Sequence, residues 1–124
     1  TALPHALSYP CSILYGVPHG HAVSLTFNEF LKFNYFNLNK NSANFSLNDR
    51  YEILFKITKT KTIFELDDYF KNLKKQADLE QNFAKLGVNI QNDYNKIIEG
   101  VNEQRLRNNP IRLKKEDLNH FFNI

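Results

Sequence analysis

The 124-residue chain is long enough for one packed domain and too short for two full ones. Hydrophobic residues make up 42% and aromatic residues 14%, which excludes a disordered tail, and a net charge of +3 without a basic block argues against nucleic-acid binding. Cys11 is the single cysteine, and no apolar run approaches the roughly 20 residues of a membrane span, so we expect a cytoplasmic protein that contacts no membrane. Because the chain lacks methionine and begins at Thr1 within an apolar pattern, we also expect it to belong to a longer polypeptide.

The first predicted helix covers residues 4–15. Pro4 suits a first helical turn, where its missing N–H is no loss, and Gly16 followed by Pro18 indicates the end of the helix. Pro10 lies inside this helix and removes one backbone hydrogen bond. We therefore expect a kink or an irregular first turn there.

A second helix is predicted from Gly20 to Phe36, where apolar and aromatic residues recur at helical spacing. Such an aromatic stripe could stack on nucleic-acid bases, but we interpret it as core packing. Residues 37–49 are polar and predict a loop.

Two pairs of residues have the pattern of helix starts. Ser46 with Asp49, and Thr62 with Glu65, place a side-chain oxygen before the free amides of a helix, and the second pair matches a capping box. Apolar residues at positions i, i+3, i+4 and i+7 follow, so both helices should be amphipathic.

Shorter helices complete the chain. One ends at Gly87, the next begins near Ile90 and is broken at residues 108–110, and the last holds Leu118, Phe121 and Phe122. No alternation of apolar and polar residues is long enough to predict a β-sheet. The predicted fold class is all-α.

Two histidines, His5 and His19, flank the first helix fourteen positions apart. Ten helical residues rise about 15 Å and four extended residues return at most about 14 Å, so the two imidazoles can meet if the chain reverses at Gly16. Imidazole binds iron and zinc, but two ligands do not complete a site, and spacing alone equally fits surface or capping histidines. His21 and His120 are expected to be ordinary.

The segment LPHALSYPCSILYGVPHGHAV, residues 3–23, resembles the signature of the iron-containing, or group III, alcohol dehydrogenases. Residues 86–122 are similar to the closing helices of that family, and residues 37–80 match mainly in helical character. The resemblance implies that residues 1–124 are the distal part of the multi-helix C-terminal domain of the dehydroquinate synthase-like fold. The family's N-terminal dinucleotide-binding domain would lie outside this chain.

The resemblance also implies an activity and a site. The complete enzyme would transfer a hydride between NAD(H) or NADP(H) and a small alcohol or aldehyde, using Fe²⁺ or Zn²⁺ held by one aspartate and three histidines. His5 and His19 match two of these three histidines. Tyr9 stands where many members have a histidine near the substrate, so it is the candidate catalytic residue, and with the Pro-His-Gly-His motif it resembles a branch that includes phosphonoacetaldehyde-type reductases. No cofactor-binding residue is predicted within this chain.

Two further expectations concern the chain by itself. It should be inactive and bind metal weakly, since half of the ligand set and the nucleotide site are missing, and its exposed apolar faces should favour a homo-oligomer. The alternative is a standalone or degenerate helical interaction module without catalytic activity, in which neither histidine binds anything.

Overall fold

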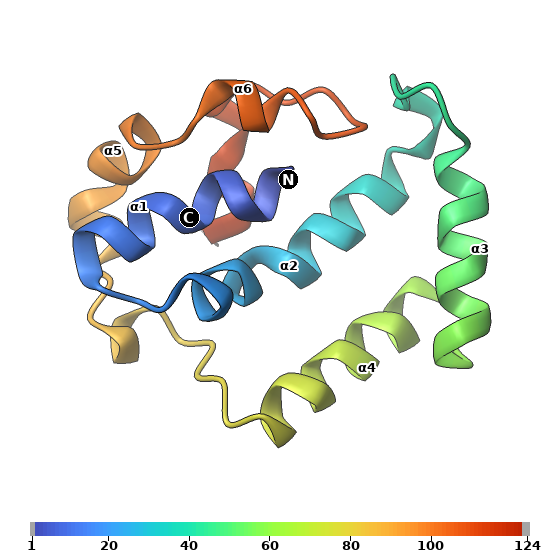
Figure 1. The fold of residues 1–124 in the computed structure, drawn as a ribbon, viewed down its shortest axis with the longest axis horizontal. Coiled ribbons are helices and arrows are strands. Elements are labelled where there is room, and N and C mark those ends of the chain that lie inside the picture. The colour runs from blue at the N-terminus through green and yellow to red at the C-terminus, as the bar shows by residue number, and fades with distance from the viewer. Residues whose placement is uncertain (1, 123–124) are drawn as a thin grey trace.

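The computed structural model describes residues 2–122, and these residues form helices joined by short loops (Figure 1). The helices are α1 (Leu3–Tyr15), α2 (His19–Phe36), η1 (Leu38–Lys40), α3 (Leu47–Thr58), α4 (Ile63–Gln76), η2 (Ala84–Leu86), α5 (Ile90–Glu99), α6 (Glu103–Leu106) and η3 (Lys115–Phe122). Extended pairing among the described residues is limited to one isolated bridge between Asn41 and Ile111. The all-α prediction is confirmed.

The first two helices form a hairpin that reverses at Gly16. Gly16 has a φ of 68°, a conformation that suits glycine, and its N–H donates to the Ser12 carbonyl at 3.0 Å. After two more residues α2 begins at His19 and packs along α1 (Figure 1). The predicted reversal is thus present, and it brings the start of α2 back beside α1.

Pro10 does not interrupt α1, which runs unbroken from Leu3 to Tyr15. The expected irregular start is therefore absent. The Pro10 ring is buried, and a Cβ placed on Gly100 would lie only 3.1 Å from the Pro10 Cβ. Close packing of this ring against the end of α5 offsets the hydrogen bond that proline removes.

Two hydrophobic clusters form the core. The first joins α1 and the start of α2 to α5 and η3, and the second joins the later part of α2 to α3 and α4. Phe30 and Phe33 of α2 pack against both clusters, so the aromatic stripe is core, as predicted. Among the described residues, no helix is long and apolar enough to cross a membrane.

The predicted starts of α3 and α4 are confirmed. The Ser46 hydroxyl accepts from the Asp49 N–H at 3.2 Å, and the Thr62 hydroxyl accepts from the Glu65 N–H at 3.1 Å. The Glu65 carboxylate, however, accepts from the N–H of Lys61 at 2.6 Å, one residue earlier than in the capping box. The reciprocal bond therefore fixes the turn before the helix.

The end of α5 was predicted too late. The helix ends at Glu99, and Asn102 then caps the separate helix α6 by accepting from the Arg105 N–H at 3.0 Å. The last predicted helix is present, but as the 3₁₀ helix η3, which begins at Lys115.

Candidate metal centre

The hairpin brings the predicted site residues together. His5 lies in the first turn of α1 and His19 is the first residue of α2, and their ring centroids are 5.3 Å apart. Tyr9, one turn after His5, has its ring centroid 5.4 Å from that of His19. The His19 ring thus contacts both other rings, and His19 is exposed whereas His5 and Tyr9 are half-buried.

Ser8 sets the orientation of the His19 ring. Its hydroxyl donates to the His5 carbonyl at 2.8 Å and lies 3.2 Å from His19 Nδ1. The bond to the His5 carbonyl uses the single hydroxyl hydrogen, so the contact with Nδ1 is a hydrogen bond in the His19 tautomer that carries its proton on Nδ1. In that tautomer the Nε2 lone pair of His19 is available to a ligand.

Charge and burial favour the neutral form of His5. Burial lowers the pKa of His5, and the nearby His19 and Arg105 lower it further. The His5 ring makes no hydrogen bond to another residue of the described chain. A neutral imidazole with free nitrogens is the form that binds a metal ion.

These two imidazoles fit part of a metal site. Imidazole suits both iron and zinc, and a site for either ion needs three or more protein ligands. Within residues 2–122, no group of three or more histidine, cysteine and acidic side chains could hold a metal ion. A site that used His5 and His19 would therefore need further ligands from outside the described residues.

The remaining histidines and the cysteine lie apart from this pair. His21 Nε2 contacts the Glu80 carbonyl at 2.5 Å, and His120 is exposed in η3. Cys11 is buried, and burial raises the pKa of its thiol to about 11, so it is an inert core residue.

Sequence reasoning missed Arg105, a residue of α6. Its Cζ lies 4.4 Å from the centroid of the Tyr9 ring, on a helix far from Tyr9 in sequence. No motif or spacing signals this contact. Ser8 was also missed, although its position three residues after His5 is compatible with a bond back to the His5 carbonyl.

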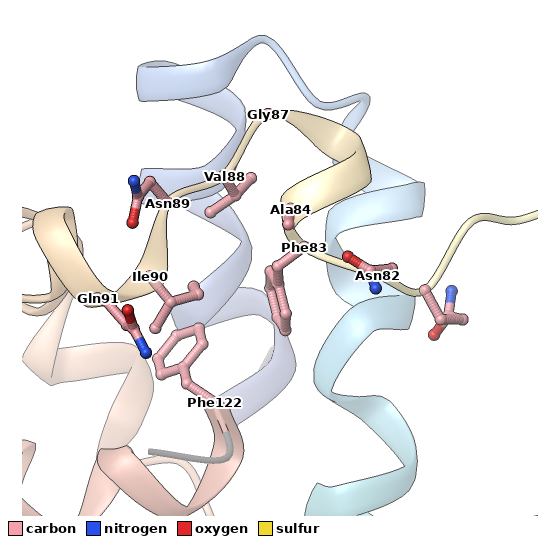
Figure 2. Close-up of a pocket in the computed structure, with 10 residues that line it drawn as sticks. Asn82, Phe83, Ala84, Gly87, Val88, Asn89, Ile90, Gln91 and Phe122 are labelled. Carbon is pink, nitrogen blue, oxygen red and sulfur yellow. The ribbon is translucent and has the colours of Figure 1, made fainter.

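A cavity of about 650 Å³ lies elsewhere in the molecule (Figure 2). Phe83, Val88, Ile90 and Phe122 form its apolar wall, and amide side chains including Asn89 stand at its edge. No ionisable side chain and none of the predicted site residues are among the described residues that line it. It therefore offers neither acid–base groups nor metal ligands.

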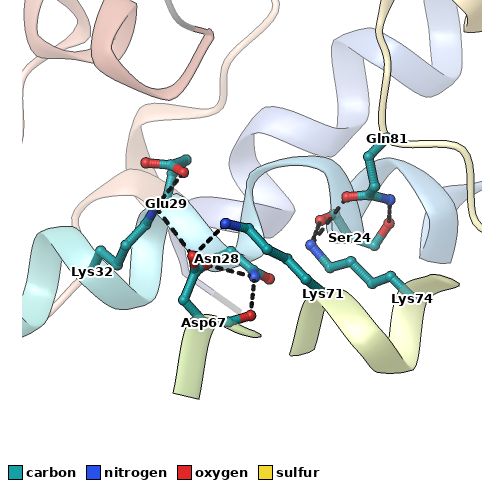
Figure 3. Close-up of polar contacts among 8 residues, drawn as sticks. All are labelled: Ser24, Asn28, Glu29, Lys32, Asp67, Lys71, Lys74 and Gln81. Carbon is teal, nitrogen blue, oxygen red and sulfur yellow. Dashed lines mark hydrogen bonds and ion pairs between the residues drawn. The ribbon is translucent and has the colours of Figure 1, made fainter. Parts of the chain in front are cut away.

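A polar network joins α2 to α4 (Figure 3). Buried Asp67 accepts from the Asn28 amide at 2.8 Å and pairs with Lys71 at 2.6 Å. Lys74 donates to the Ser24 carbonyl at 2.5 Å, and burial lowers the pKa of its amine to about 8. Each of these groups bonds to the facing helix or to its own, so the network holds the two helices together.

The structure is an all-α domain whose first helical hairpin brings two imidazoles together, with ring centroids 5.3 Å apart. Residues 1–123 match the sequence model of the Fe-containing alcohol dehydrogenase family, C-terminal. The chain therefore belongs to the Fe-containing alcohol dehydrogenase family, and it corresponds to the C-terminal region. Comparisons with curated proteins and with solved structures gave no match.

Proposed function

We propose that this chain is the distal part of the metal-binding helical domain of an alcohol dehydrogenase or aldehyde reductase that uses NAD(H) or NADP(H). The observation that carries the proposal is the pair of neighbouring imidazoles, with ring centroids 5.3 Å apart, in a chain of the Fe-containing alcohol dehydrogenase family. A dinucleotide-binding domain elsewhere in the polypeptide would hold the cofactor. The cytoplasm is the proposed location.

The residues of this chain have separate roles in the proposed reaction. His5 and His19 hold Fe²⁺ or Zn²⁺ together with ligands from outside the chain. Ser8 favours the tautomer of His19 in which Nε2 is unprotonated and can bind the ion. The bound ion supplies Lewis acidity, which polarises a carbonyl oxygen or lowers the pKa of an alcohol. Tyr9 stands beside His19 with a hydroxyl that has no hydrogen-bond partner among the described residues, so it is free to donate to the substrate oxygen.

The proposal also covers the behaviour of the chain by itself. Alone it would be inactive and bind metal weakly, because two imidazoles are only part of a ligand set. Ile57 and Phe64 of α3 and α4 are 71% and 65% exposed, so contact with another copy or with the rest of the polypeptide is expected there.

These exposed apolar side chains favour one alternative, a helical interaction module whose histidines bind nothing. In that case a His5→Ala substitution would be nearly neutral in every assay. The proposed enzyme instead requires His5 for metal retention.

The proposal is tested by assaying NADH and NADPH consumption with short aldehydes and added ferrous iron. The complete polypeptide that carries this chain is compared with its His19→Ala variant, and bound iron and zinc are measured after dialysis. His120→Ala is the matched control, because His120 is an exposed histidine outside the hairpin. We expect His19→Ala alone to lose both metal and activity. Activity absent in all forms, or unchanged in His19→Ala, would favour the interaction module.

A further inference from the structure

A second cavity, of about 600 Å³, has a lysine amine in its wall. Lys74, near the end of α4, is half-buried there and reaches across to α2 (Figure 3). Its amine donates to the Ser24 carbonyl at 2.5 Å and to Gln81 Oε1 at 3.0 Å. The apolar residues that line the cavity are Leu25, Leu79, Phe83 and Phe121. The cavity therefore offers apolar space beside a held amine.

The direct partners of Lys74 are neutral amide oxygens. Among residues 2–122, no carboxylate lies within 4.0 Å of its amine, whereas Lys71, one turn earlier, pairs with Asp67 at 2.6 Å. The bond to Asp67 raises the pKa of Lys71, but burial lowers the pKa of Lys74 to about 8 and outweighs the charges of Asp67 and Glu29. At pH 7.4 a lysine with this pKa is neutral in roughly one molecule in five, against about one in a thousand for an ordinary lysine.

The two hydrogen bonds of Lys74 leave its lone pair free in the neutral form. A neutral amine has two N–H groups and one lone pair, and the oxygens of Ser24 and Gln81 accept both hydrogens. No donor among the described residues bonds to the amine nitrogen. The lone pair of a partly desolvated lysine is a nucleophile towards carbonyl carbon. A small carbonyl compound in the cavity can therefore react with Lys74.

We propose that Lys74 is a covalent modification site that binds short apolar aldehydes as a protonated imine. The lone pair forms a C–N bond with the aldehyde carbon, and one proton passes from the nitrogen to the oxygen. The C–O bond then breaks as water leaves, with uptake of one proton from solvent. The product keeps one N–H for an amide oxygen and a positive charge that suits the nearby Asp67 and Glu29, whereas an acylated lysine would lose this charge. The inference stands apart from the proposed function, because no reducing cofactor takes part.

The test incubates the complete polypeptide with butanal and cyanoborohydride, without NADH or NADPH. Cyanoborohydride transfers a hydride to the imine carbon, which leaves a stable butyl amine that peptide mass spectrometry locates at successive times. Lys75, the next residue, is exposed and lines the same cavity, so it is the internal control. The neutral fraction of Lys74 is roughly 200-fold larger than that of an ordinary lysine, but a less basic amine is a weaker nucleophile, as it is for thiols. We therefore expect Lys74 to react about tenfold faster than Lys75.

Two controls connect the reaction to the folded cavity. In urea the cavity is lost and both lysines are solvated, so Lys74 and Lys75 should react at the same rate. Lys74→Arg should abolish the fast phase of total labelling, whereas Lys75→Arg should retain it. If Lys74 reacts no faster than Lys75 in the folded protein, or keeps its advantage in urea, the inference is wrong. The same holds if Lys74→Arg retains the fast phase.

Discussion

Replacing Ser8 by alanine tests whether the hairpin prepares His19 as a metal ligand. The substitution removes two contacts, the bond to the His5 carbonyl at 2.8 Å and the contact with His19 Nδ1 at 3.2 Å. The first is a local bond within α1, and the second is at the long end of the range for an N–H···O bond. We therefore expect a loss of stability of only about 0.5–1 kcal/mol.

The expected effect on metal binding is larger than the effect on stability. Loss of the group that orients a metal-binding histidine costs about 10- to 100-fold in affinity. Because His19 is exposed, water can take the place of the Ser8 oxygen. We therefore expect a loss at the lower end of this range, about tenfold in metal affinity or 1.4 kcal/mol in binding free energy. The assay is competition for ferrous or zinc ion against a chelator of known affinity, with the complete polypeptide.

Ser12→Ala provides the matched control for Ser8→Ala. Ser12 lies one turn later in α1, and its buried hydroxyl has no hydrogen-bond partner among the described residues. Its removal should leave both stability and metal affinity unchanged. The reasoning is refuted if Ser8→Ala binds metal within about twofold of the wild type, or if both variants lose affinity equally.

Two further predictions concern stability. Asn109→Ala leaves the buried Asn34 side chain and the Ile111 carbonyl without their present hydrogen-bond partners. We therefore expect the free energy of unfolding to fall by about 2–4 kcal/mol and the melting temperature to fall by roughly 10 °C. A fall of less than about 0.5 kcal/mol in urea unfolding would contradict this. Burial by itself raises the pKa of Asp67, but bonds from Lys71 and Asn28 and the nearby lysine charges outweigh it and lower the pKa below the model-peptide value of 3.8. The carboxylate thus stabilises the fold above about pH 4 and loses this contribution as the pH falls through its lowered pKa. The difference in urea stability between wild type and Asp67→Asn should therefore shrink on acidification, and a difference independent of pH would refute the assignment.

Local signals in the sequence determined where most helices begin and end. Ser46 and Thr62 cap α3 and α4, and Gly16 and Gly87 adopt left-handed conformations after α1 and η2. These features depend on residues a few positions apart, and their hydrogen bonds form within one turn. The meeting of His5 and His19 belongs in the same group, because a single hairpin with one reversal separates them.

Only the tertiary structure decided the surroundings of that pair. Arg105 reaches Tyr9 because α6 packs on α1, and α5 ends where Gly100 meets the Pro10 ring. The contact of Ser8 with His19 likewise depends on the angle between α1 and α2. Such contacts join residues whose separation along the chain carries no periodic pattern, so they are fixed by packing of the whole core and not by local propensity. The sequence by itself determined an all-α chain with two histidines at one turn, and the packing of its helices decided which side chains surround them.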